Sequence, residues 1–384
     1  MNKYLISILL ILILVILYME SKYYYSKYLQ YKKEYFNIKN QRGGNGSNKL
    51  CFDLAKKING VFSPLSITFA LSILHLGAYG NTDKQLTELF NNKYTINELN
   101  NIYTLFNNDI MKVTNVLILN NKYKVNNQYL DLIKNLSLIE YRSFNDINFI
   151  VKRVNNYIET NTKGLIKDTI SNRDIDLSTI MILINTIYFK ANWMNEFNPN
   201  KTHKSTFRGL DKKINMMTQT NNFNYHENND LQIIEIPYKQ NDYTMGIILP
   251  KGDEIPIISN NKFISLIDNL KTERIELYLP KFTHRKNIQL VPILQNLGIT
   301  DLFNSNANLN ISDKAYVSKI IHESVVIVDE KGTEAAAVTV VIMKSMAVMP
   351  LYIKPIIFRA DHEFIYYIRH IPTNTLLFYG NFNG

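Results

Sequence analysis

The amino-acid sequence predicts an α+β fold. Helical patterns gather in the N-terminal half of the chain and strand patterns dominate the C-terminal half, a separation typical of α+β proteins. Residues 180–189 (IMILINTIYF) are apolar on both faces, as a central strand covered on both sides requires. With 384 residues, 46% of them hydrophobic, the chain can bury a large core.

Apolar spacing predicts the helices. Residues 49–58 carry apolar side chains at every fourth position, which indicates a short amphipathic helix. Pro64 suits the start of a second helix over 65–76, and this helix is apolar on nearly every side, so we expect it to be buried. Two further helices are expected at 82–90 and within 147–168.

Short runs of branched and aromatic residues predict the strands. The runs become more frequent towards the C-terminus of the chain. The expected strands are 113–119, 180–189, 231–237, 243–249, 275–279, 324–329, 355–359, 364–369 and 375–379.

The basic charge is concentrated at the N-terminus. The chain has a net charge of +10, and residues 1–49, with eight basic and two acidic side chains, account for +6 of it. A nucleic-acid-binding domain would carry this excess on its folded part, so the distribution argues against a nucleic-acid partner. The single cysteine, Cys51, excludes an internal disulfide and a cysteine-based zinc cluster.

Residues 4–19 form a nearly continuous apolar run. Its length falls between a signal-peptide core and the roughly 20 residues of a membrane-spanning helix. Small residues suited to a cleavage site are missing after it, which favours an uncleaved membrane anchor over a cleaved signal peptide, and both alternatives stay open. Residues 42–47 read as a flexible Gly-rich linker. We therefore expect an anchor or signal plus linker in residues 1–47 and one folded domain in 48–384.

Motifs of common enzymes are missing from the sequence. It contains no GxSxG, HExxH, CxxC or GxGxxG, and its seven histidines do not pair at metal-ligand spacing. The sequence therefore predicts a protein without catalytic residues, bound metal or cofactor.

Residues 330–343 (EKGTEAAAVTVVIM) stand out by their period-two pattern. One face is small and uncharged, so it could enter the interior of a sheet without burying a charge. This face carries Thr333, Ala335, Ala337, Thr339, Val341 and Met343, and the other carries Glu334, Ala336, Val338, Val340, Ile342 and Lys344.

An ordered set of motifs resembles the serpin family from about Asn48 to Gly384. The motifs are 61–67 (VFSPLSI) with 76–80 (LGAYG), 185–190 (NTIYFK) with Trp193 and Phe197, Met216 and Met217 with Gln219, 279–282 (LPKF), 297–303 (LGITDLF), His322 with 329–337 (DEKGTEAAA), 358–370 (FRADHEFIYYIRH) and 377–380 (LFYG). Abundant Asn, Lys, Ile and Tyr indicate an AT-rich coding genome, such as that of a large DNA virus.

The resemblance implies a monomeric domain of three β-sheets surrounded by eight or nine helices, with an exposed reactive-centre loop at about 330–354. It implies a suicide-substrate inhibitor that a serine or cysteine protease cleaves, after which the loop inserts into the large sheet and traps the covalent complex. The alternative is a non-inhibitory binding or carrier protein. The small residues of the insertion face favour inhibition.

The resemblance also assigns individual residues. The loop hinge comprises Glu330, Gly332, Thr333, Glu334, Ala335, Ala336 and Ala337. Ser66, Asn185 and His322 match the polar gate beneath the opening sheet, and Trp193 matches the adjoining breach region. Counting along the loop places the cleaved bond between Met346 and Ala347, with Lys344 and Ser345 as the alternative.

Four N-x-S/T sequons would matter only in an exported protein. They begin at Asn45, Asn135, Asn200 and Asn310.

Overall fold

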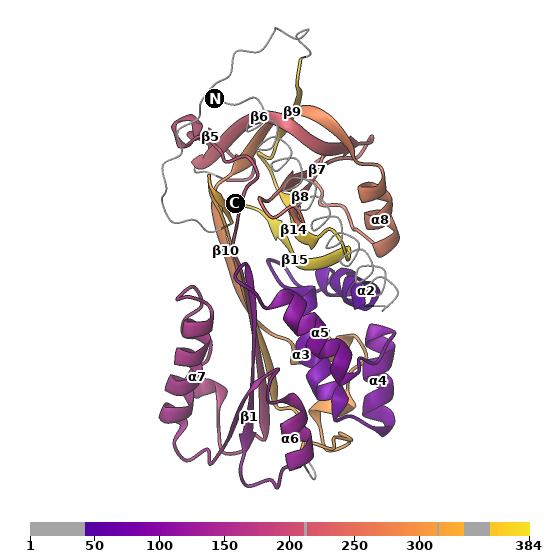
Figure 1. Ribbon diagram of the computed structural model, residues 1–384, viewed down its shortest axis with the longest axis vertical. Helices are drawn as coiled ribbons and strands as arrows, with labels where there is room; N and C mark the ends of the chain where they lie inside the picture. Colours follow the sequence, from indigo (N-terminus) through magenta and orange to yellow (C-terminus); the bar gives the residue numbers. More distant parts are fainter. Residues whose placement is uncertain (1–42, 211–212, 313–314, 334–353) are drawn as a thin grey trace, which may run out of the picture. The chain divides into compact units, whose positions relative to one another are not determined.

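The computed structural model describes residues 43–384 except 211–212, 313–314 and 334–353, and for residues 43–46 only the backbone (Figure 1). One compact unit extends from Asn45 to Gly384. Among the described residues the chain forms eight α-helices and fifteen strands. None of these helices combines the length and apolarity needed to cross a bilayer. The apolar run at 4–19 lies outside the described residues.

Six of the eight helices precede the strand Met181–Phe189, in agreement with the predicted gathering of helices towards the N-terminus. The helix at 65–76 is confirmed: its N-cap Ser63 accepts a hydrogen bond from the Ser66 N–H, and the helix is buried nearly all round. The eight helices are α2 (Gly43–Ala55), α3 (Pro64–Leu76), α4 (Gly80–Phe90), α5 (Ile96–Phe106), α6 (Asn127–Ile133), α7 (Ile147–Asn161), α8 (Asn260–Asp268) and α9 (Val291–Asn296).

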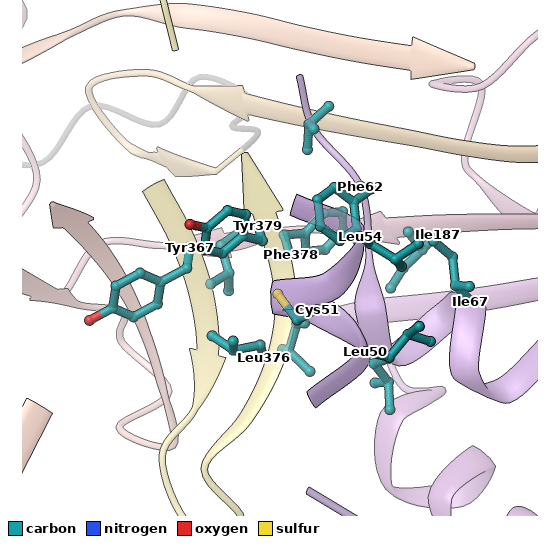
Figure 2. Close-up of a cluster of buried hydrophobic side chains, with 14 of the residues drawn as sticks. Leu50, Cys51, Leu54, Phe62, Ile67, Ile187, Tyr367, Leu376, Phe378 and Tyr379 are labelled. Atoms are coloured by element: carbon teal, nitrogen blue, oxygen red, sulfur yellow. The ribbon is translucent and has the colours of Figure 1, made fainter. Parts of the chain in front are cut away.

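Helix α2 begins at Gly43, earlier than the 49–58 pattern indicates, so residues expected as linker form its first turns. Asn48 connects the helix to the start of β15 (Thr375–Phe382). Its Nδ2 donates to the carbonyl oxygen of Asn374, just before β15, at 2.7 Å, and its Oδ1 accepts from the Leu376 N–H at 3.0 Å. Figure 2 shows Cys51 among the apolar side chains at this contact. Glycine has a low helix propensity, so the helix depends on its later residues, of which Leu50, Cys51 and Leu54 are fully buried.

One sheet has seven strands, and its central strands β3 and β11 pair in parallel. Its order is β2-β1-β3-β11-β12-β4, and β10 lies antiparallel along β11. Its strands are β1 (Met111–Asn120), β2 (Leu138–Arg142), β3 (Met181–Phe189), β4 (Ala191–Asn192), β10 (Phe282–Gln289), β11 (Lys319–Val328) and β12 (Gly332–Thr333). As predicted, β3 is buried along its whole length.

The two smaller sheets implied by the resemblance are joined into one eight-stranded network. The 15-residue strand β6 joins them, because it pairs with β9 along one part and with β7 along the other. The order is β13-β9-β6-β7-β8-β14-β15 with β5 beside β6. The bounds are β5 (His203–Thr206), β6 (Lys213–Glu227), β7 (Leu231–Pro237), β8 (Tyr243–Pro250), β9 (Lys271–Pro280), β13 (Ile356–Arg359), β14 (Phe364–His370) and β15 (Thr375–Phe382).

The two faces of the seven-stranded sheet are buried against different partners. Ile184 of β3 and Ile321 of β11 join a cluster under α7, the helix drawn beside β1 in Figure 1. Leu183 and Ile187 of β3, one residue out of phase, join the main core instead. A strand lying between β3 and β11 must therefore alternate between the main core and the α7 side.

Candidate functional site

The predicted gate residues come together at the middle of the β3–β11 pair. Asn185 of β3 and His322 of β11 are partners in the strand register. The Asn185 Oδ1 atom lies 2.7 Å from His322 Nδ1 and accepts a hydrogen bond from the Ser66 hydroxyl, also at 2.7 Å. All three side chains are fully buried. The structure thus brings three residues that are distant in sequence into one hydrogen-bonded group.

The hydrogen bonds of His322 define its protonation state. The Ser63 N–H donates to Nε2 at 3.1 Å, so Nε2 is unprotonated and Nδ1 carries the proton that is donated to Asn185. Burial lowers the pKa of His322 to about 3, because the charged imidazolium would be desolvated. At neutral pH the gate therefore contains a neutral imidazole.

Sequence reasoning missed a fourth member of the gate, Asn115 of β1. Its Oδ1 accepts from the Asn185 Nδ2 at 2.7 Å, and its own Nδ2 donates to the Leu136 carbonyl oxygen at 3.1 Å. The available signal was a polar residue within the apolar run at 113–119. A buried amide there must find partners, and the gate supplies them.

The pairing between β3 and β11 stops above the gate. Their register runs from Ile182 and Lys319 to Ile187 and Ser324, and the remaining residues of the two strands do not pair with each other. At the far end, β12 pairs with β11 on one side and with β4 on the other. The two strands therefore diverge beyond Ile187 and Ser324, and β12 lies at the far end of this divergence, between β11 and β4.

Two predicted hinge residues, Gly332 and Thr333, make up β12 and are already part of the sheet. The Thr333 side chain is fully buried, and its hydroxyl oxygen lies 2.6 Å from that of Tyr238. A Cβ on Gly332 would come within 2.1 Å of the Ala191 carbonyl oxygen, so this position needs glycine. Thr333, the first residue expected to enter the sheet, is therefore already one of its strand residues in this structure.

Trp193, the predicted breach residue, holds the turn before β12. Its indole Nε1 donates to the Asp329 carbonyl oxygen at 2.9 Å, and its backbone N–H donates to the Lys331 carbonyl oxygen at 2.8 Å. The indole stacks on the Tyr238 ring with 4.6 Å between ring centroids. Trp193 thereby connects the turn to the residue that contacts Thr333.

Glu330, the first hinge residue, is fixed by two side chains. Lys281 Nζ lies 2.7 Å from Oε2, and the Thr202 hydroxyl donates to Oε1 at 2.9 Å. Partial burial alone would raise the pKa of the Glu330 carboxyl, but the hydrogen bonds from Lys281 and Thr202 lower it below its usual value. The base of the loop is therefore anchored while its tip continues beyond the described residues.

The rest of the predicted loop lies outside the described residues. This applies to four hinge residues and to both alternative cleavage bonds, namely Glu334, Ala335, Ala336, Ala337, Met346, Ala347, Lys344 and Ser345. Three anchoring residues, Tyr238, Lys281 and Thr202, were not predicted; the LPKF motif contains Lys281, but no sequence pattern connects it with Glu330. Within the described part of the chain, no cluster of three potential ligands could hold a metal ion.

The fold is an α+β domain in which the residues that lead into the loop, Gly332 and Thr333, are already paired with β11 and β4. A sequence model of the Serpin (serine protease inhibitor) family matches residues 46–384. The chain is 41% identical to the uncharacterized serpin-like protein R700 of Acanthamoeba polyphaga mimivirus, over 93% of this chain and 99% of that protein. It is 34% identical to human neuroserpin, over 84% of this chain and 85% of neuroserpin.

Solved structures agree with the sequence comparisons. Native protease nexin-1 with heparin matches with a TM-score of 0.78 and 28% identity, covering 90% of this chain and 99% of that structure. The chain therefore belongs to the serpin family. The mimivirus relative also supports the origin in a large DNA virus that the AT-rich composition indicated.

Proposed function

We propose that the protein is a suicide-substrate inhibitor of a serine or cysteine protease. In this mechanism the protease nucleophile attacks the carbonyl carbon of Met346 and the bond to the Ala347 nitrogen breaks. The proton of the nucleophile passes to the new amino group, and an ester or thioester links Met346 to the protease. The chain supplies the cleaved loop and stays covalently bound to the protease, and it contributes no catalytic residue of its own.

The buried position of Thr333 is the observation that carries this proposal. Because Thr333 faces the main core beside Tyr238, a strand that continues from it places Ala335 and Ala337 on the same side. Glu334 then lies on the opposite face of the strand, the face that is directed towards α7. The face that must enter the core is the small, uncharged one, so insertion leaves no charge buried there.

Strand insertion also has a driving force. Insertion separates the paired stretch of β3 and β11, Ile182–Ile187 with Lys319–Ser324, but the new strand then pairs with both strands, so more ladder hydrogen bonds form than break. Each hydrogen bond gained in this way contributes about 0.5–1.5 kcal/mol net, and burial of valine and isoleucine side chains adds to it. Insertion faster than hydrolysis of the acyl link would leave the protease trapped.

A panel of purified proteases tests the proposal. We expect at least one serine or cysteine protease to form a complex that survives SDS, and N-terminal sequencing of the released fragment to start at Ala347. A start at Ser345 would move the cleaved bond to the alternative and leave the mechanism intact. Cleavage by every protease in the panel without any stable complex would support the alternative, a non-inhibitory binding or carrier protein.

The N-terminal segment bears on the location of the protein. We propose that residues 4–19 direct the chain to a membrane and remain as an anchor; a cleaved signal peptide would give a secreted inhibitor. Three of the four sequon asparagines, Asn135, Asn200 and Asn310, are exposed and could carry glycans in an exported chain.

A further inference from the structure

An asparagine followed by glycine, Asn59 and Gly60, lies in the connection from α2 to the bridge between Phe62 and Tyr379. Glycine after asparagine favours deamidation, because glycine has no side chain to hinder its nitrogen or to restrict the backbone. The φ angle of Gly60 is +111°, a value that residues with side chains rarely adopt. The fold therefore requires glycine at this position, and with it a chemically reactive pair.

The side chain of Asn381, near the end of β15, holds both reactive groups of this pair. Its Oδ1 accepts a hydrogen bond from the Gly60 N–H at 2.7 Å, and its Nδ2 donates to the Asn59 Oδ1 at 2.8 Å. A third hydrogen bond, from Nδ2 to the Glu363 Oε1 at 3.2 Å, orients the Asn381 amide. For a reaction between the pair, the Gly60 nitrogen must lose its proton and approach the Asn59 side-chain carbon. Both changes break hydrogen bonds to Asn381.

Burial does not protect the asparagine of this pair. Asn59 is exposed, and it lies with Gly60 and Asn381 in the wall of a cavity of about 300 Å³, so water reaches it. Lys56 and Lys57 line the same cavity. Their positive charges favour the negatively charged nitrogen that forms when Gly60 loses its proton. The surroundings therefore support the reaction, and the hydrogen bonds of Asn381 oppose it.

We propose that Asn59 is a deamidation site which Asn381 keeps unreactive in the folded chain and which becomes reactive when the end of β15 detaches. The Gly60 nitrogen loses its proton and bonds to the Asn59 side-chain carbonyl carbon. The bond from this carbon to the amide nitrogen breaks, and that nitrogen takes up the proton and leaves as ammonia. One water then opens the cyclic imide to aspartate or isoaspartate, so water is the only co-reactant.

Isoaspartate at position 59 makes detachment of β15 irreversible. It adds one carbon atom to the backbone directly before Gly60. Only two residues further on, Phe62 and Tyr379 exchange two backbone hydrogen bonds of 3.0 Å, which join this segment to β15. With a longer backbone, Gly60 and Phe62 cannot both regain their partners on β15. The modification therefore records each detachment that lasts long enough for the reaction.

Incubation of the full chain at pH 8 and 37 °C in ¹⁸O-labelled water, followed by peptide mapping, tests the site. The label marks each asparagine that reacts during the incubation. We expect Asn381→Ala to deamidate at Asn59 about tenfold faster than the wild type or more, the effect of losing two hydrogen bonds. Asn48→Ala is the matched control, because it also removes two hydrogen bonds to the β15 region but none to Asn59 or Gly60. Its rate should stay within about twofold of the wild type.

Equal rates at Asn59 in the wild type and Asn381→Ala would overturn the proposal. Equal acceleration in Asn48→Ala would also overturn it, because the protection would then come from overall stability. A measurement on the wild type does not depend on how the variants fold: in mild urea, deamidation of Asn59 should rise in proportion to hydrogen exchange of the Gly60 amide. Wild-type chain that carries isoaspartate, separated and returned to buffer, should exchange its β15 amides faster than unmodified chain. Unchanged β15 exchange would refute the irreversible change.

Discussion

The hydroxyl groups of Tyr238 and Thr333 lie 2.6 Å apart in a fully buried contact. Burial raises the pKa of Tyr238, so its hydroxyl stays protonated and a proton is available for this bond. Withdrawing Thr333 from the sheet would leave the Tyr238 hydroxyl without this partner, at a cost of about 1–3 kcal/mol. The contact therefore stabilises Thr333 in its strand position between β11 and β4.

Thr333→Arg should convert the protein from an inhibitor into a substrate. A guanidinium at this position would have to occupy the main core beside Tyr238, where the Thr333 side chain is fully buried. The hinge should then stay outside the sheet, and insertion should become slower than hydrolysis of the acyl link. We expect loop cleavage to persist while the SDS-stable complex falls by at least tenfold on a gel.

Glu334→Arg is the matched control for this experiment. It places the same side chain one residue further along, on the face that period two directs towards α7 and away from the core. Trapping should stay within about twofold of the wild type, because no charge enters the core. If Thr333→Arg traps protease as efficiently as Glu334→Arg, the face assignment of the loop is wrong.

Cleavage within residues 340–347 should raise the thermal midpoint markedly. We expect the freed strand to insert between β3 and β11, which separates their paired stretch, and to gain ladder hydrogen bonds with both strands. The measurement compares melting before and after nicking with a protease that is not trapped. Cleaved Thr333→Arg should gain little; an unchanged midpoint in the cleaved wild type would favour the non-inhibitory alternative.

Much of the fold could be predicted because its signals are local. Strand β3 is an unbroken apolar run, and β7 (Leu231–Pro237) has the predicted bounds, since both are buried segments with branched side chains. Other elements were missed for physical reasons. Strand β6 is rich in Asn and Thr, and β10 has a mostly exposed, charged face, so neither shows an apolar period.

The candidate site likewise contains residues that local motifs reveal and contacts that they do not. Ser66, Asn185 and His322 lie in recognisable motifs, and the structure brings their side chains into hydrogen-bonding contact. By contrast, the contact of Tyr238 with Thr333 and the ion pair of Lys281 with Glu330 depend on how distant strands meet. No local pattern encodes such pairings, because each residue taken alone is an ordinary buried tyrosine or exposed lysine.

Acid should destabilise the protein between pH 6.5 and 5. Burial lowers the pKa of His322 to about 3, and burial with the nearby Arg369 charge lowers that of His370 to about 4. Both are neutral when folded at these pH values, whereas the unfolded chain takes up protons below about pH 6.5. Their stabilisation is complete above pH 6.5 and is lost as pH falls towards the folded pKa values.

Urea unfolding at pH 7.5, 6.5, 5.5 and 5 measures this effect. Each of the two histidines should contribute up to about 1.4 kcal/mol per pH unit below pH 6.5. His370→Phe keeps the ring contacts with Phe106 and Tyr243 and should reduce the slope by one such contribution. Stability that is constant or rises on acidification would contradict the assignment of neutral buried imidazoles.

If residues 4–19 are an uncleaved anchor, the full-length protein should stay with membranes through a carbonate wash, and its N-terminal peptide should be recovered. Deleting residues 1–42 removes the run but leaves α2 whole, including the docking residue Asn48. This truncated chain should be released from membranes and should trap protease as well as the full chain, since the described strand partners of β12 and hydrogen-bond partners of Ser66, Asn185 and His322 all lie after residue 42. A mature chain that starts near Ser21 or Lys22 would instead establish a cleaved signal peptide and a secreted inhibitor.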